Sequence, residues 1–177
     1  MSMCPRLRRD FRRLADIKGW GTLRALFDGV FLDSGFQALI AYRCAHTLKK
    51  WAVPLLPAVL RRWSIGACAI DIVPQADIAG GCYIPHGLGI VIGGASVIGE
   101  DCTILQGVTL GEARFSTDAC PRIGDRVTLG AGAKILGPIE IGDDTFIGAN
   151  SVVLDDVPPG SVAVGAPAVA RPRDREL

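Results

Sequence analysis

Residues 84–111 read IPHGLGIVIGGASVIGEDCTILQGVTLG, and Ile92, Ile98, Ile104 and Leu110 stand six residues apart within this stretch. The same spacing continues outward in both directions, with one shift of two residues before Ile92 and a longer break after Glu112. Ile, Leu or Val occupies all thirteen positions of the pattern: 72, 78, 84, 92, 98, 104, 110, 123, 129, 135, 141, 147 and 153. Glycine directly follows seven of them, where a backbone without a Cβ can turn tightly.

A six-residue period predicts a stacked repeat in which each unit is a short strand and a turn, with its aliphatic side chain pointing inward. Three units close one triangular coil, and stacked coils pair their strands in parallel. A parallel sheet of the α/β type needs crossover segments of about a dozen residues between strands, for which these repeats leave no room. The sequence therefore predicts a mainly β fold, a parallel β-helix over residues 70–157.

The remaining sequence divides around this β-helix. Residues 1–69 are expected to form an N-terminal helical region that covers one end of the coils, with helices over 6–18, 23–30 and 35–50 and a short one within 59–67. Residues 112–122 form an excursion loop. After Pro158, residues 158–177 are expected to form a strand, a turn and a charged tail at the other end.

Charge is distributed unevenly along the chain. Residues 1–62 hold twelve Lys and Arg against four Asp and Glu, whereas the remainder holds seven against fourteen. This basic N-terminal region is either a solvated helical face or a surface for an anionic partner, and it allows peripheral contact with a membrane. It lacks the interleaved aromatic residues of a nucleic-acid interface, so no nucleic acid is expected.

Six cysteines occur without a CxxC pair, which favours reduced thiols and a cytoplasmic location. No Cys or His pair has the spacing of zinc ligands, so no metal is expected. The basic N-terminus is not followed by the apolar segment of a signal peptide, and no apolar run is long enough to span a membrane.

His86 lies at the first shift in the repeat, and histidine is the side chain best suited to proton transfer near neutral pH. Asp71 precedes it by fifteen residues, nearly one coil, so both can lie near the same corner. A carboxylate there could orient the imidazole as in catalytic triads. The residues alone also allow an ordinary turn histidine and a local cap. His46, in the third expected helix, is expected to have a packing role.

Two long runs carry a family resemblance. They are DIVPQADIAGGCYIPHGLGIVIGGASVIGEDCTILQGVTLGE (71–112) and GAGAKILGPIEIGDDTFIGANSVVLDDVPPGSVAVGAPA (130–168). They closely resemble the serine acetyltransferases, which are hexapeptide-repeat acyltransferases with a left-handed β-helix. The likeness extends over residues 34–168.

The resemblance implies a catalytic pair of Asp71 and His86. It also implies acetyl-CoA in a groove between neighbouring chains of a homotrimer. The implied cofactor-binding positions are Gly111, Ala131, Lys134 and Ala149, with Lys134 facing a CoA phosphate, and the implied substrate-binding positions are Gln106 and Cys120.

The sequence departs from the family pattern on the substrate side. Pro85 replaces an aspartate before the catalytic histidine, and Ala119 and Cys120 replace an Arg-His pair that contacts the serine carboxylate. An N-terminal aspartate of the family has no counterpart near Gly19–Gly21. The chain also ends in Leu177 rather than in the isoleucine that docks the family's sulfhydrylase partner, so that complex is not expected.

These features predict an O-acetyltransferase in which His86 activates an acceptor hydroxyl, with L-serine as the first acceptor. A sugar, polysaccharide or natural-product hydroxyl is the alternative, because serine needs charged partners at both ends. A non-catalytic β-helix scaffold is a third reading. A zinc enzyme resembling the gamma-class carbonic anhydrases would need three histidines per site, and the coils contain one.

Overall fold

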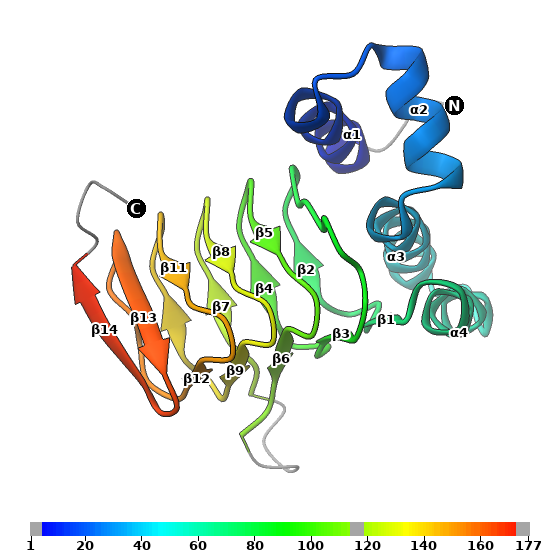
Figure 1. The fold of residues 1–177 in the computed structure, drawn as a ribbon. Coiled ribbons are helices and arrows are strands. Elements are labelled where there is room, and N and C mark those ends of the chain that lie inside the picture. Colours follow the sequence, from blue (N-terminus) through cyan, green and yellow to red (C-terminus); the bar gives the residue numbers. More distant parts are fainter. Residues whose placement is uncertain (1–4, 114–118, 173–177) are drawn as a thin grey trace.

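The computed structural model describes residues 5–113 and 119–172, which form an N-terminal helical region followed by a stack of coils (Figure 1). The helices are α1 Pro5–Lys18, α2 Thr22–Phe31, α3 Ser34–Lys50 and α4 Leu56–Cys68. The first three begin and end within one residue of the sequence prediction. The fourth was predicted too short: it begins at Leu56 because Pro57 lies in its first turn, where no backbone N–H is needed for a helical hydrogen bond.

The strands form three faces of a prism, and from β3 to β12 consecutive strands along the chain lie on successive faces. The first face contains β1 Ile70–Ile72, β3 Ile90–Ile92, β6 Thr109–Gly111, β9 Lys134–Leu136 and β12 Val152–Val153. The second face contains β2 Asp77–Ile78, β4 Val97–Ile98, β7 Arg122–Ile123 and β10 Glu140–Ile141. The third face contains β5 Thr103–Ile104, β8 Thr128–Leu129, β11 Phe146–Ile147, β13 Ser161–Gly165 and β14 Ala168–Pro172.

The periodic aliphatic residues form the core. Each of the thirteen positions in the pattern is at most 4% exposed, and all thirteen belong to one hydrophobic cluster. Burying a side chain of this size contributes about 1.5–3 kcal/mol. The parallel ladders match the prediction, since every pair within the coils is parallel and joins residues in equivalent positions, such as Ile72 with Ile92 and Ile92 with Leu110.

The C-terminal end differs in part from the prediction. β13 is the expected strand, but the chain then turns and returns as β14, which pairs with β13 in antiparallel fashion. The expected charged tail at 173–177, and the middle of the excursion loop at 114–118, lie outside the described residues.

Helix α3 covers the open end of the first coil. Leu39 and Tyr42 belong to the same buried cluster as the coil residues. The Tyr42 hydroxyl donates to the carbonyl of Ala76 at 2.6 Å and accepts from the backbone N–H of Ile78. His46 packs against the Tyr42 ring, and its Nδ1 lies 2.9 Å from the carbonyl oxygen of Pro74, so the predicted packing role of His46 is confirmed.

A buried ion pair fixes α1 and α3 to the coils. Arg43 Nε lies 3.0 Å from Asp10 Oδ2, and the two side chains are 3% and 0% exposed. Asp10 also accepts from the backbone N–H groups of Gly81 and Cys82, and Arg43 donates to the carbonyl of Ala79. Both charges are therefore satisfied by several partners, which is the condition under which a buried pair is tolerated.

We predict that Arg43→Met lowers the free energy of unfolding by about 3–5 kcal/mol, because it leaves the Asp10 carboxylate buried without its cation. Chemical denaturation at a fixed protein concentration measures the change. The control is Arg24→Ala, which removes a pair with Asp28 at a site where Arg24 is 71% exposed, and which should cost at most about 1 kcal/mol. An Arg43→Met variant as stable as the control would contradict this role for the pair.

Cysteine environments within the described residues differ sharply. Cys44 is exposed, whereas Cys68, Cys82, Cys102 and Cys120 are buried, and all five are free thiols. Burial raises the pKa of Cys102 to about 11 and raises that of Cys82 further still. Since the thiolate is the reactive form, both groups are protected twice, by inaccessibility and by protonation.

Iodoacetamide at pH 8 should therefore modify Cys44 in the folded protein and leave Cys82 and Cys102 unmodified. Peptide mass spectrometry, with a urea-unfolded sample as the positive control, gives the extent of labelling at each cysteine. Native labelling of Cys82 at the rate of Cys44 would show that the coil interior opens.

Candidate active site

The turns that lead from the third face to the first face stack along one edge of the prism, here called the His86 edge. Backbone hydrogen bonds of 2.7 Å run along it, from Gly107 N–H to the carbonyl of Leu88, from Gly132 N–H to that of Gln106, and from Asn150 N–H to that of Ala131. Four residues predicted for the site, His86, Gln106, Ala131 and Ala149, therefore belong to this one edge.

The turn that carries His86 is held between α3 and β1. Gly35, in the first turn of α3, lies so close to the coil that a Cβ there would be 2.0 Å from the carbonyl oxygen of Ile84. A Cβ on Gly87 would meet the Ile70 side chain at 2.5 Å. Gly89 N–H donates to the carbonyl of Ala69 at 2.8 Å. Two close approaches that only glycine permits thus fix the backbone beside an exposed His86 side chain.

Asp71 begins the outward-facing column of the first face. Its register partner is Val91, followed on the next strands by Thr109, Lys134 and Val152. The residues before Asp71 contact the His86 turn: the carbonyl of Ala69 accepts from Gly89 N–H, and the Ile70 side chain lies against Gly87.

The partner of Asp71 in the structure is Arg61 from α4. Arg61 Nε donates to Asp71 Oδ1 at 2.6 Å, and Nη2 donates to Oδ2 at 2.8 Å, a two-pronged pair that raises the pKa of Arg61. Within the described residues, no hydrogen bond or ion pair joins Asp71 to His86. The predicted orienting bond is therefore not formed in this chain alone.

Lys134 makes contacts within its own chain. Its ammonium group donates to the carbonyl of Gly107 at 2.5 Å and to Thr109 Oγ1 at 3.1 Å. The Lys134 side chain thus contacts the preceding coil at two points, Gly107 on the His86 edge and Thr109 in the outward column. Its predicted role toward a CoA phosphate stays a prediction.

Gly111 and Cys120 lie at the opposite edge of the first face. Gly111 ends β6 and accepts from Gly137 N–H, and Cys120 is 8% exposed with its sulfur against Gly93, just after β3. A three-residue strand separates the two edges by roughly 10 Å. A single chain therefore does not bring Cys120 and Gly111 together with His86.

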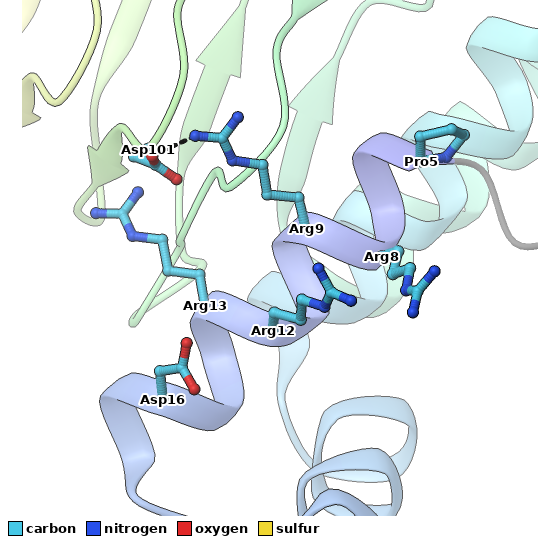
Figure 2. A pocket seen from close by; sticks show the side chains of 7 residues that line it. All are labelled: Pro5, Arg8, Arg9, Arg12, Arg13, Asp16 and Asp101. Carbon is cyan, nitrogen blue, oxygen red and sulfur yellow. Dashed lines mark hydrogen bonds and ion pairs between the residues drawn. The ribbon is translucent and has the colours of Figure 1, made fainter.

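Among the cavities beside the helical region, two have more than one cationic side chain in their linings. One of about 240 Å³ has Lys49, Arg61, Pro74 and Gln75 in its lining, beside the Arg61–Asp71 pair. The other, of about 920 Å³, lies between α1 and the coils and has four arginines in its lining: Arg8, Arg9, Arg12 and Arg13 (Figure 2).

Two of the arginines that line the larger cavity attach α1 to the coils. Figure 2 shows Arg9 reaching Asp101, at 2.6 Å, while Arg8 and Arg12 lie on the side of the helix away from it. Arg13 donates to the carbonyl of Cys102 and to Thr103 Oγ1. The basic N-terminal region therefore contacts the acidic coils of its own chain, and contact with a membrane stays a prediction. No described helix is long and apolar enough to cross a bilayer.

Sequence reasoning missed Arg61 as a site residue. Arg61 precedes Asp71 by ten residues, and between them the chain passes from a helix to a strand. The only signal was the pair Arg61-Arg62 in an amphipathic segment, which reads equally well as a solvated helix face. Within residues 5–113 and 119–172, no group of three or more His, Cys, Asp or Glu side chains could hold a metal ion.

Comparison with known proteins identifies the fold and the family. The family described as "Bacterial transferase hexapeptide (six repeats)" matches residues 120–155. A serine acetyltransferase of Helicobacter pylori (strain J99) is 45% identical over 153 residues, covering 86% of this chain and 90% of that protein.

Solved structures agree. A serine acetyltransferase in complex with CoA is 38% identical, with a TM-score of 0.85 over 93% of this chain and 68% of that one. The Neisseria gonorrhoeae serine acetyltransferase in complex with serine is 34% identical, with a TM-score of 0.84 over 93% of this chain and 67% of that one. The prediction of a left-handed parallel β-helix with an N-terminal helical region is confirmed, and the scaffold reading is set aside. The chain belongs to the serine acetyltransferase family and is an acyltransferase.

Proposed function

We propose that this protein transfers the acetyl group of acetyl-CoA to the hydroxyl of L-serine, giving O-acetyl-L-serine and free CoA. The observation that carries the proposal is the exposed His86 at the head of an edge that also contains Gln106, Ala131 and Ala149. Related structures with bound CoA and bound serine support the two substrates. Five free thiols among the described residues support action in the reducing cytoplasm.

His86 acts as the general base. Its imidazole takes the proton of the acceptor hydroxyl while the hydroxyl oxygen forms a bond to the thioester carbon. When the carbon–sulfur bond breaks, the same imidazolium returns the proton to the CoA sulfur. A single exposed imidazole can perform both transfers because histidine is the side chain best suited to accept and release a proton near neutral pH.

Asp71 is the positioning residue for His86. A carboxylate offers about four acceptor positions, so Asp71 can accept from an imidazole Nδ1–H while it keeps at least one bond to Arg61. Such a bond fixes the tautomer that leaves Nε2 free to act as the base. To form it, the exposed His86 side chain turns toward β1, against which the backbone of its turn is held.

The backbone along the His86 edge suits acetyl-CoA. Small residues at Ala131 and Ala149 leave peptide groups accessible at successive turns, and the amide groups of CoA's pantetheine arm can pair with such groups. A backbone N–H in one of these turns would stabilise the oxyanion that develops on the thioester. We therefore place acetyl-CoA along the turns of the His86 edge, with its thioester next to His86.

Completion of the site requires a second chain. Gly111 and Cys120 lie at the far edge of the first face, roughly 10 Å from the His86 edge. In a homotrimer with parallel prism axes, the far edge of one chain can face the His86 edge of its neighbour. We therefore place the groove for acetyl-CoA between chains.

We predict that His86→Ala lowers kcat by about 10²–10⁴ while the fold is retained. Steady-state assays of CoA release, with circular dichroism as the check on folding, measure both effects. The matched control is His46→Gln, which alters the only other histidine and should keep kcat within about threefold. Full activity in a folded His86→Ala variant would remove this residue from the mechanism.

We also predict that acetyl-CoA and L-serine together release CoA and that O-acetyl-L-serine appears in equal amount by mass spectrometry. Nucleotide sugars and oligosaccharides, which represent the glycan alternative, should release CoA at the rate of buffer alone. The relatives reported above give that alternative no support. Faster release with a glycan than with serine would replace the proposed acceptor.

A further inference from the structure

Cations are scarce near the outward column of the first face. Among the described residues from Ile70 to Pro172, Lys and Arg occur at four positions: Arg122, Arg126, Lys134 and Arg171. Arg122 lies on the second face and Arg171 on the third. Arg126 is paired with Asp144, and Lys134 is bonded to the preceding coil. None of them pairs with Asp71.

The helical region brings a cation to this place. Arg61 pairs with Asp71 through its Nε–H group and one Nη2–H group. The cavity of about 240 Å³ opens beside Arg61, toward Pro74 and Gln75 in the turn that follows β1. Lys49 and Gln75 also line this cavity, which thus places two cationic side chains and an amide beside an apolar wall from residues 53–58. Such a lining suits a small anionic group, above all a carboxylate, which matches the planar fork of an arginine.

We propose that Arg61 selects acceptors that carry a carboxylate, an inference that rests on the proposed function. Without acceptor, the guanidinium pairs with Asp71. When serine binds, at least one N–H group of Arg61 turns to the serine carboxylate, and the Asp71 oxygen that it leaves accepts from His86. Binding of the correct acceptor thus completes the orientation of the base.

The exposure of the pair makes this exchange feasible. The Arg61 and Asp71 side chains are 37% and 26% exposed, so water and substrate can reach both. Ion pairs at such positions contribute little to stability, and one carboxylate can replace another at a guanidinium without a large change in free energy. The buried pair of Asp10 and Arg43, at 0% and 3% exposed, could not exchange in this way.

The test compares L-serine with L-serinamide, in which a neutral amide replaces the carboxylate and the hydroxyl is unchanged. The unsubstituted protein should prefer serine by roughly 10- to 100-fold in kcat/KM, as expected for a hydrogen-bonded charge pair. Arg61→Gln should remove most of this preference by raising KM for serine, so that kcat/KM falls far more for serine than for serinamide.

Arg62→Gln is the matched control. It removes the same charge from the next residue of α4, which is exposed, and it should keep the preference for serine. An equal loss with both acceptors in Arg61→Gln would overturn the proposal, because Arg61 would then act only by holding Asp71. An unchanged preference would overturn it as well.

Calorimetric titration with L-serine in the absence of acetyl-CoA separates this proposal from the proposed function. Serine binding that depends on Arg61, without acetyl transfer, supports the carboxylate site and overturns the proposed reaction. Acetylation of serine with equal binding in both variants supports the reaction and overturns the carboxylate site. A protein that neither binds nor acetylates serine overturns both.

Discussion

The structure depends on one constraint, which is that every sixth residue must fit inside a narrow prism. Each unit turns the chain by a third of a coil, so one side chain per unit points to the axis, where it meets only other side chains of its kind. Ile, Val and Leu fill that space without polar atoms to satisfy. Because the interior is taken up by packing, every residue available for chemistry lies on an outward position or at a turn. The candidate site accordingly consists of turn residues along one edge and an outward carboxylate.

The sequence predicted those parts of the molecule that depend on neighbours close along the chain. The thirteen inward positions follow from a period of six, and the first three helices follow from helical spacing. The pairing of Asp71 with His86 stays a prediction, since no hydrogen bond or ion pair joins them within the described residues. The sequence did not predict β14, whose pairing depends on a turn that brings β13 and its partner together, nor the start of α4 ahead of Pro57. It also missed Arg61, because the contact of this α4 side chain with the first coil depends on how the helix packs, which no local sequence pattern indicates.

The uneven distribution of charge has its main explanation within the chain. Arginines of α1 reach acidic groups at the corners of successive coils: Arg6 meets Asp77, and Arg9 meets Glu100 and Asp101. These pairs are partly exposed and individually weak, whereas the buried pair of Asp10 and Arg43 gives the contact a fixed geometry. Much of the positive charge of the helices thus faces negative charge of the coils across the interface between them.

The same prism also explains why the proposed site draws on the helical region and on a second chain. A closed coil with a filled core cannot bend to bring its two edges together, so His86 at one edge stays apart from Gly111 and Cys120 at the other. Among the described residues, the outward position next to Asp71 on the following strand is Val91, which carries no charge. A helix packed against the first coil supplies Arg61 at that point alone. In the proposed reaction, the repeats thus provide the base, the helices provide a cation for the acceptor carboxylate, and a neighbouring chain would provide the far wall of the groove.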